Sequence, residues 1–263
     1  MGTARGRRGR PAGRPERGTA SGVAGSVPGV EVMGVAARGA LSADAAPNPW
    51  FSWDYVQANW GDITEALGQH VGLTLQAILV ATAIALPLAL LAHARPRLVG
   101  PVLGLSGVLY TIPSLALFAL LNPILRDRRE SVLIGLVMYA LLVLVRNILV
   151  GLQGVDPAVV DAARGLGFGR LRLLFTVQLP GALPAIVTGL RLATVTTIAL
   201  VTIGVVIGYG GLGQLMYRGF NSQYRAEVVT ATVLTLALAL LADVVLWLAG
   251  RLAAPWARAG GGR

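Results

Sequence analysis

The chain has 263 residues, of which 55% are hydrophobic and 34 are glycine, while 13% are charged; its mean hydropathy is +0.68. Soluble domains are about 45–50% apolar with glycine included, so this composition indicates a membrane protein. The net charge of +10 does not indicate a nucleic-acid partner, because six of the 22 basic residues lie in the first 20 positions and the others are scattered.

Several kinds of chemistry are excluded by residue types that the sequence lacks. All 22 basic residues are arginine, there is no cysteine, and the only histidines are His70 and His93. A P-loop or Schiff-base lysine, a thiolate nucleophile and a Cys/His zinc site are therefore ruled out. We expect a non-catalytic protein without cofactor or metal, whose ATP, if any is used, is bound by another chain.

Residues 1–46 are predicted to form a disordered tail rich in arginine, glycine and proline. The arginines that give it this character are Arg5, Arg7, Arg8, Arg10, Arg14 and Arg17. Arg7 and Arg8 resemble a twin-arginine export signal, but Pro28 and Glu31 interrupt the segment that would have to be its apolar core. A start of translation at Met33 is an alternative explanation of this composition.

An aromatic cluster marks the next segment, residues 47–70. Its large rings belong to Trp50, Phe51, Trp53, Tyr55 and Trp60. Indole and phenol rings gather at the membrane–water interface, which predicts an interfacial anchor. The alternative is an aromatic cage for a quaternary ammonium ligand.

Five apolar stretches follow, each long enough to form a membrane span. They cover residues 71–92, 99–121, 131–145 with a continuation past Arg146 to Val150, 182–207 and 228–249. A helix of about 20 residues crosses the hydrocarbon core. The sequence thus predicts a transmembrane domain over residues 71–250, interrupted by a polar loop at 152–181 and followed by a tail at 251–263.

The arginine distribution favours placing the 152–181 loop in the cytoplasm. With that orientation, eight arginines lie in inner segments and five in outer loops. The arginine-rich tail would then lie outside, against the same rule, so the preference for this orientation is modest.

A proline interrupts the second predicted span. Pro113 removes a backbone donor and leaves the carbonyl of Leu109 without its helical partner, while Thr111 and Ser114 supply hydroxyl groups beside it. Together with Tyr110 these residues are candidates for the lining of a translocation path. A packing kink stabilised by neighbouring helices is the alternative.

The polar loop has the signals of a short helix followed by a turn. Asp156 is a good N-cap, Pro157 suits the first helical position, and Gly165 or Gly167 can end the helix. We expect Leu166 and Phe168 to be exposed at the turn, as in a docking element; an ordinary connecting loop is the alternative.

A second short amphipathic helix is predicted over residues 171–179, ending at Pro180. Together the two helices would form a helix-turn-helix that lies across the membrane surface.

Other conspicuous residues in the spans have structural explanations. The pattern Gly208-x-Gly210-x-x-Gly213 matches a dinucleotide fingerprint, but it follows a membrane span instead of a strand and favours close packing. The ionisable residues Arg146, Arg191 and Asp243 lie near the predicted cytoplasmic ends, where snorkelling or mutual pairing accommodates them. His70 and His93 are too far apart for a metal site.

The loop resembles the EAA loop of binding-protein-dependent ABC importer permeases. The matching residues are Asp161-Ala162-Ala163, Gly167 and Val177-Gln178-Leu179-Pro180, with Asp161 in place of Glu and Val177 in place of Ile. Segments 51–55, 110–116, 139–147 and 207–213 are similar to the glycine betaine, carnitine, choline and proline branch of that family. The resemblance covers roughly residues 50–250.

The resemblance implies an all-α, polytopic type-1 permease in a bacterial cytoplasmic (inner) membrane. It further implies partners: cytoplasmic ABC ATPase subunits, an identical or homologous second permease subunit and an extracytoplasmic solute-binding protein. The transported molecule would be a compatible solute. Coupling to the ATPase would involve eight loop residues: Asp156, Asp161, Ala162, Ala163, Gly167, Phe168, Leu179 and Pro180.

Two other functions remain open at this point. One is a permease of the same superfamily for amino acids or methionine. The other is a stand-alone secondary transporter or channel, for which intramembrane acidic residues and internal repeats would be expected. A membrane-anchored nucleic-acid binder using the arginine tail has little support.

Overall fold

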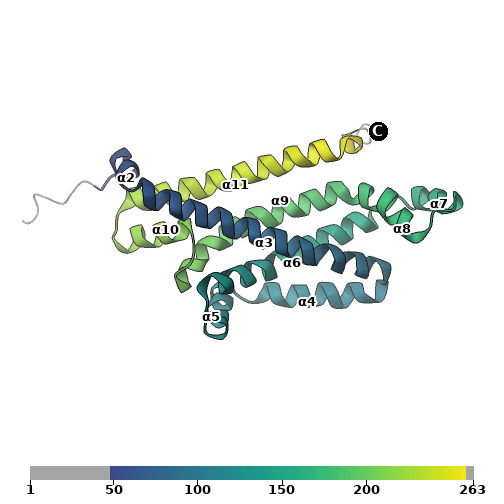
Figure 1. Ribbon diagram of the computed structural model, residues 1–263, viewed down its shortest axis with the longest axis horizontal. Helices are drawn as coiled ribbons and strands as arrows, with labels where there is room; N and C mark the ends of the chain where they lie inside the picture. The colour runs from purple at the N-terminus through teal and green to yellow at the C-terminus, as the bar shows by residue number, and fades with distance from the viewer. Residues whose placement is uncertain (1–47, 259–263) are drawn as a thin grey trace, which may run out of the picture. The chain divides into compact units, whose positions relative to one another are not determined.

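Long apolar helices account for most of residues 48–258, the part of the chain that the computed structural model describes (Figure 1). Four helical segments are long and apolar enough to cross a membrane: α3 (Trp60–Ala94), α6 (Arg128–Gln153), the segment Arg170–Ile207 that contains α9 (Leu179–Ile203), and α11 (Arg225–Ala253). Each covers more than the ~30 Å of the hydrocarbon core at 1.5 Å per residue. The described residues form no strands, in agreement with the predicted all-α class.

The second predicted span, residues 99–121, is not one straight helix. Helix α4 (Val99–Thr111), which follows the 3₁₀ turn η1 (Pro96–Leu98), and α5 (Ser114–Leu125) meet at a bend of 92°. Ile112 and Pro113 between them have extended ψ angles of 125° and 130°. The pair counts as a fifth span if both helices cross the membrane together, so the structure has four or five spans where five were expected.

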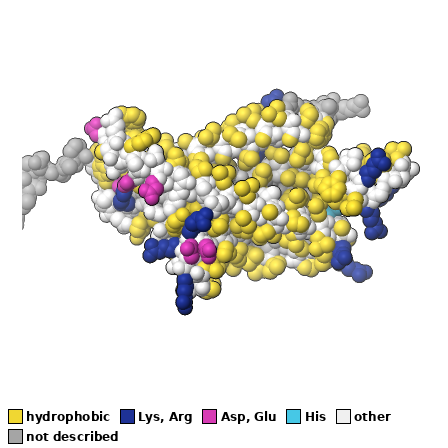
Figure 2. All heavy atoms as spheres, in the orientation of Figure 1, with side chains coloured by type: hydrophobic (Ala, Val, Ile, Leu, Met, Phe, Trp, Pro, Cys, Tyr) yellow, Lys and Arg dark blue, Asp and Glu magenta, His cyan; other side chains and the backbone are white. Residues whose placement is uncertain are grey.

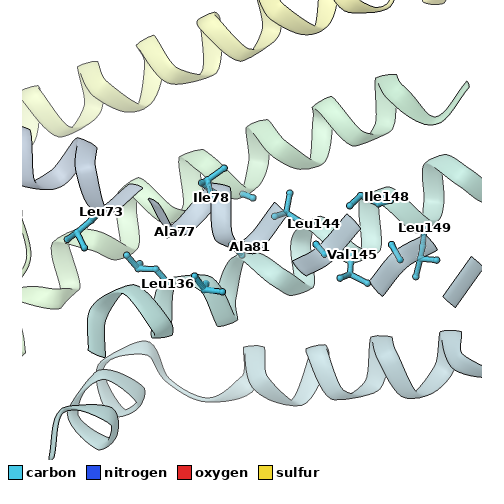
Figure 3. Packing of buried hydrophobic residues seen from close by; sticks show 14 of the residues in the cluster. Leu73, Ala77, Ile78, Ala81, Leu136, Leu144, Val145, Ile148 and Leu149 are labelled. Atoms are coloured by element: carbon cyan, nitrogen blue, oxygen red, sulfur yellow. The ribbon is translucent and has the colours of Figure 1, made fainter. Parts of the chain in front are cut away.

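The core lies where α3, α6 and α9 pack together (Figure 3). Helix α3 contributes a stripe of fully buried alanines spaced four residues apart: Ala77, Ala81, Ala85 and Ala89. Small residues at this spacing let helices approach closely, which is how helices associate in lipid without a hydrophobic driving force. Larger buried side chains of α6, including Leu136, Leu144 and Ile148, fill the space opposite them.

Helix α11 packs against α9 but leaves most of its surface outside the bundle, since 11% of its most apolar window is buried. At Gly250 a side-chain methyl would lie 2.4 Å from Cγ1 of Val187, so the two helices nearly touch there. Arg191 and Asp243 form a two-pronged ion pair between α9 and α11, with N–O distances of 2.8 and 2.7 Å. Of the two accommodations expected for Arg146, Arg191 and Asp243, snorkelling or mutual pairing, the structure shows pairing for Arg191 and Asp243.

Short elements gather at the two ends of the helices (Figure 1). One end carries α2 (Trp53–Ala58), α5, the 3₁₀ turn η3 (Gly204–Ile207) and α10 (Leu212–Asn221). The other carries α7 (Pro157–Gly165), α8 (Arg170–Leu173) and the end of α11, followed by the 3₁₀ turn η4 (Pro255–Arg258). On the face shown in Figure 2, acidic side chains gather at the α2 and α5 end, while yellow apolar side chains cover the middle.

One predicted segment lies outside the described residues, and one predicted helix is wrong. The predicted tail, residues 1–46, with its arginines, the twin-arginine motif and Met33, lies outside the described residues. The predicted separate helix over residues 171–179 is wrong: α8 continues through a π-helical turn (Leu174–Gln178) into α9. Pro180 does not end a helix, since it lies in the first turn of α9, directly after the π-helical turn.

Candidate functional site

The polar loop folds as the sequence signals predict. The side chain of Asp156 caps α7 by accepting a hydrogen bond of 2.8 Å from the Ala158 N–H, and Pro157 is the first helical residue. Helix α7 ends at Gly165, and Gly167 adopts the left-handed φ of +81°. The N–H groups of Gly167 and Phe168 then bond back to the carbonyls of Arg164 and Ala163. A local cap and a local turn therefore define this helix at both ends.

The inner face of α7 is held by a small apolar cluster. Val160 and Ala163 are buried against Leu173 of α8, with Val155, Phe168 and Val177 packed around them. The guanidinium carbon of Arg172 lies 4.3 Å above the ring of Phe168. Phe168 is thus half-buried, and the expectation that it would be exposed with Leu166 is wrong. Its ring stabilises the turn from inside.

The outer face of α7 carries exposed apolar side chains at helical spacing. Val159, Ala162 and Leu166 follow each other at intervals of three and four residues, and Leu166 is 78% exposed. We call these three residues the α7 stripe. Asp161 and Arg164 border it as an exposed ion pair of 3.0 Å. An apolar stripe with this spacing is the usual contribution of a helix that binds in a groove of another protein.

The loop is connected rigidly to the membrane helices. Nε2 of Gln178 lies 3.2 Å from Nε2 of His93 on α3. A methyl group at Gly181 would lie 3.0 Å from Cγ2 of Val155, so the start of α9 lies close to the start of the loop. Leu179 and Pro180 are half-buried in the first turn of α9. The loop therefore contacts α3 through His93 and the start of α9 through Gly181.

The predicted path residues lie at the other end, around the α4–α5 bend. Tyr110, Thr111 and Pro113 are exposed, and Ser114 is half-buried at the start of α5. The carbonyl of Ile112 accepts a hydrogen bond from the hydroxyl of Tyr139 on α6. The rings of Tyr110 and Tyr139 meet edge to face with centroids 5.6 Å apart. The hydroxyl of Tyr139 thus satisfies a backbone carbonyl at the bend, and its ring packs the bend against α6.

Sequence reasoning missed the role of His70, which is fully buried. Its Nδ1 accepts a 3.3 Å hydrogen bond from the Leu212 N–H, and its Nε2 lies 3.0 Å from the carbonyl of Ile198. One neutral imidazole therefore joins α3, α9 and α10. Nearby, Oε1 of Gln69 accepts from the Gly211 N–H at 2.8 Å. The signal available in the sequence was the adjacent polar pair Gln69 and His70 at the start of an apolar span.

The glycines at 208–213 make the close packing that the sequence predicts. A methyl group at Gly213 would lie 2.3 Å from the carbonyl oxygen of Thr202, and one at Gly210 would lie 2.4 Å from the Val205 nitrogen. At Gly211, which has a φ of +52°, it would lie 2.8 Å from Cβ of His70. The segment folds against the end of α9 and turns the chain into α10.

A second missed cluster centres on Arg218 of α10. Its guanidinium bonds Glu227 of α11 at 2.5 Å and Asp62 of α3 at 2.9 Å. Burial raises the pKa of the nearby Tyr55 to about 12, although the Arg218 guanidinium acts in the opposite direction. An open cavity of about 440 Å³ adjoins this cluster and is lined in part by Glu65, Gln69 and Gln214. The three charges lie on three different helices, and Asp62 is 156 residues from Arg218, so no local pattern reveals the cluster.

The aromatic cluster at residues 50–60 has the exposure of a surface anchor. Trp50, Phe51, Trp53 and Trp60 are each between 57% and 68% exposed. Tyr55 instead points inward and packs edge-on against Tyr224, with ring centroids 5.4 Å apart. Phe51 and Trp53, with ring centroids 6.4 Å apart, form the one close pair among these four exposed rings in the described part of the chain.

The sequence matches the family of binding-protein-dependent transport system inner membrane components over residues 81–256. It is 34% identical to the carnitine transport permease protein OpuCB of Listeria monocytogenes over 175 residues, covering 66% of this chain and 80% of that protein. It is 32% identical to the glycine betaine/carnitine/choline transport system permease protein OpuCD of Bacillus subtilis, covering 74% of this chain and 86% of that protein.

The fold is similar to that of a solved permease. The match is to an inward-facing structure of the MetNI methionine ABC transporter, with a TM-score of 0.67 and 21% identity, covering 73% of this chain and 95% of the matched chain. At this identity the similarity shows the fold alone.

Proposed function

The chain belongs to the family of binding-protein-dependent transport inner membrane components, and we propose that it is the permease subunit through which an ATP-driven importer moves a compatible solute. Glycine betaine, carnitine, choline and proline are the candidate solutes. The names of the similar permeases, which include carnitine, glycine betaine and choline, support this choice. The apolar helices of this inner-membrane protein supply the membrane-spanning part of that machine.

The single observation that carries the coupling role is the α7 stripe. It exposes Val159, Ala162 and Leu166 on a helix that is capped at both ends and packs on α8 and on the π-helical turn, which contacts α3 through Gln178 and His93. We infer that a groove on a cytoplasmic ATPase subunit receives this stripe, which places the α7 end in the cytoplasm. ATP binding and hydrolysis then occur on that partner, and the movement reaches the membrane helices through Leu179 and Pro180.

A second permease subunit, identical or homologous, would complete the pathway, and an extracytoplasmic binding protein would deliver the solute. The α4–α5 bend is our candidate for the path lining, since Tyr110, Thr111, Pro113 and Ser114 bring hydroxyl groups and backbone to a break between two apolar helices. Non-helical backbone within a membrane is tolerated where protein or a water-filled cavity surrounds it.

Uptake of labelled glycine betaine into vesicles that contain the chain with its ATPase and binding protein tests the solute class. We expect saturable, ATP-dependent uptake that choline, carnitine or proline reduces in competition. Uptake of methionine or another amino acid, without uptake of any of these four solutes, would contradict the proposed class and favour the amino-acid permeases.

The coupling role is tested by Leu166→Asn. Loss of the most exposed apolar group of the α7 stripe is expected to reduce ATP-dependent uptake at least about tenfold, as hot-spot residues of interfaces do, while membrane insertion is unchanged. Leu252→Asn is the matched control, because Leu252 is 80% exposed at the same end but belongs to α11. Equal uptake by the two variants would remove the docking role of the stripe.

A further inference from the structure

The cavity of about 440 Å³ beside Arg218 lies at the end of the bundle that carries α2 and α10 (Figure 1). Its walls come from the first turns of α3, from the segment at η3 and from α10. Gln69 is the last residue of α3 in the lining, and the 25 residues that follow it, 70–94, extend about 38 Å. This length exceeds the ~30 Å of the hydrocarbon core. The cavity is therefore placed at the aqueous end of α3.

The ion pairs at this cavity leave negative charge over. Arg218 is held by two carboxylates, Asp62 at 2.9 Å and Glu227 at 2.5 Å. Glu65 lines the same cavity one helical turn after Asp62, and it forms no ion pair or hydrogen bond with the residues that the structure describes. Arg128 adds a guanidinium beside the wall that follows η3. Three carboxylates thus face two guanidinium groups, which gives a formal charge of −1.

The lining also offers hydrogen-bond acceptors that no described donor occupies. Both carboxylate oxygens of Glu65, Oδ1 of Asp62 and Oε1 of Gln214 are of this kind. The ring of Tyr217, which is 56% exposed, adds a face on which a cation packs. Lysine and arginine side chains carry three and five N–H donors for such acceptors. A quaternary ammonium group carries none and is recognised by cages of several rings, whereas the described lining holds one.

A buried hydroxyl lies behind these ion pairs. The hydroxyl of Tyr55 makes no well-formed hydrogen bond with the described residues, although Arg218 and Glu227 lie beside it. Arg218 thus has two further acceptors within reach, the carboxylate of Glu227 and this hydroxyl. An incoming cation is therefore able to replace Arg218 at Asp62 without leaving that guanidinium unpaired, a state that would be costly.

We propose that this cavity receives a lysine or arginine side chain of the solute-binding protein, which docks between Glu65 and Asp62 of α3. The identity of this partner rests on the proposed function, which has a binding protein deliver the solute at the end of the bundle opposite α7. The incoming N–H groups donate to Glu65, to Oδ1 of Asp62 and to Oε1 of Gln214. The stem of the side chain packs on the ring of Tyr217.

The test is the binding of the solute-binding protein to the full chain, assembled with its ATPase in lipid nanodiscs, at low and at high salt. We expect Glu65→Gln to weaken binding at low salt about tenfold, the loss of one charge-assisted hydrogen bond. The same variant should bind with a smaller salt dependence than the wild type, since one attractive charge is removed. Glu65→Asp, which keeps the charge, is expected to retain part of the affinity.

Glu130→Gln is the matched control, since Glu130 is an exposed glutamate at the start of α6, at the same end, and does not line the cavity. Equal binding by Glu65→Gln and Glu130→Gln would overturn the docking site alone. A binding protein that does not bind the wild type would instead contradict the partner in the proposed function, and this proposal with it. Binding of labelled choline to the chain without the binding protein, lost in Glu65→Gln, would assign the cavity to the solute and overturn the docking role.

Discussion

Single polar side chains fix the places where the helices of this protein begin, bend and meet. Asp156 starts α7, the hydroxyl of Tyr139 satisfies the backbone at the α4–α5 bend, and His70 joins three helices through its two ring nitrogens. The cap at Asp156 lies at the exposed surface, whereas Tyr139 and His70 satisfy backbone groups that an apolar environment would otherwise leave unpaired, at a cost of several kcal/mol each in lipid. A few polar residues thus have a large effect in a chain that is 55% hydrophobic.

Tyr55 is expected to make the stability of the α2 and α10 end depend on alkaline pH. Burial raises its pKa to about 12 in the folded state, against about 10 in an unfolded chain. The folded state therefore binds the proton more tightly, and this contribution to the free energy of unfolding is complete below about pH 10 and is lost as the pH rises through 12. This contribution is measured by comparing the unfolding of the wild type and of Tyr55→Phe in detergent between pH 8 and 12.

The phenylalanine variant has no proton to lose at this position, so its stability should fall less over the same interval. Parallel pH profiles for the two proteins would contradict the assignment to Tyr55. Because Tyr55→Phe keeps the ring contact with Tyr224, we expect the two proteins to differ little in stability at neutral pH.

At the scale of elements, α7 is defined by its own sequence, whereas its neighbours are not. The cap at Asp156, the proline at position 157 and the left-handed Gly167 are local signals that each act within a few residues. Pro113 is likewise a local signal, and the break expected there is a bend of 92° in the structure. The π-helical turn at Leu174–Gln178, which joins α8 to α9, has no such signal and was not predicted.

Gly167 and Gly165 form a matched pair for testing the turn after α7. A methyl group meets no atom within 4 Å at either position, but only Gly167 has a positive φ, of 81°. Gly167→Ala is therefore expected to destabilise the turn by about 1–2 kcal/mol, whereas Gly165→Ala is expected to stabilise the helix by about 0.5–1 kcal/mol. Hydrogen exchange of the α7 amides measures both effects, and faster exchange in Gly165→Ala than in Gly167→Ala would contradict this account.

At the scale of the whole molecule, the bundle combines a tightly packed centre with a peripheral helix. Helices α3, α6 and α9 pack through small side chains, while α11 contacts mainly α9 and α10. The Arg191–Asp243 pair and the contact of Gly250 with Val187 are the main attachments of α11 near the α7 end. The position of this helix therefore depends on few interactions.

Asp243→Asn is expected to destabilise the protein, because it leaves the Arg191 guanidinium beside apolar helices without its partner. The double variant Arg191→Leu with Asp243→Leu removes both charges and is expected to recover most of the loss. Thermal unfolding of the wild type and the two variants in detergent measures the difference. A double variant that is less stable than Asp243→Asn would show that the pair itself holds α11 in place.

The sequence by itself determined the class of the protein, the positions of its apolar stretches and the helix in its polar loop. These follow from composition, from runs of apolar residues and from caps, all of which depend on neighbours along the chain. It also indicated the pairing of Arg191 with Asp243, since two opposite charges in apolar spans have few other partners.

Only the tertiary structure decided which polar residues work together across the bundle. It brought Arg218 to Asp62 and Glu227, His70 to Ile198 and Leu212, and the arginines of α9 and α11 to one cavity. It also set the angle at Pro113 to 92° and buried the ring of Phe168. The physical reason is that most of these contacts join different helices, so their energies depend on how the helices pack and not on any local pattern.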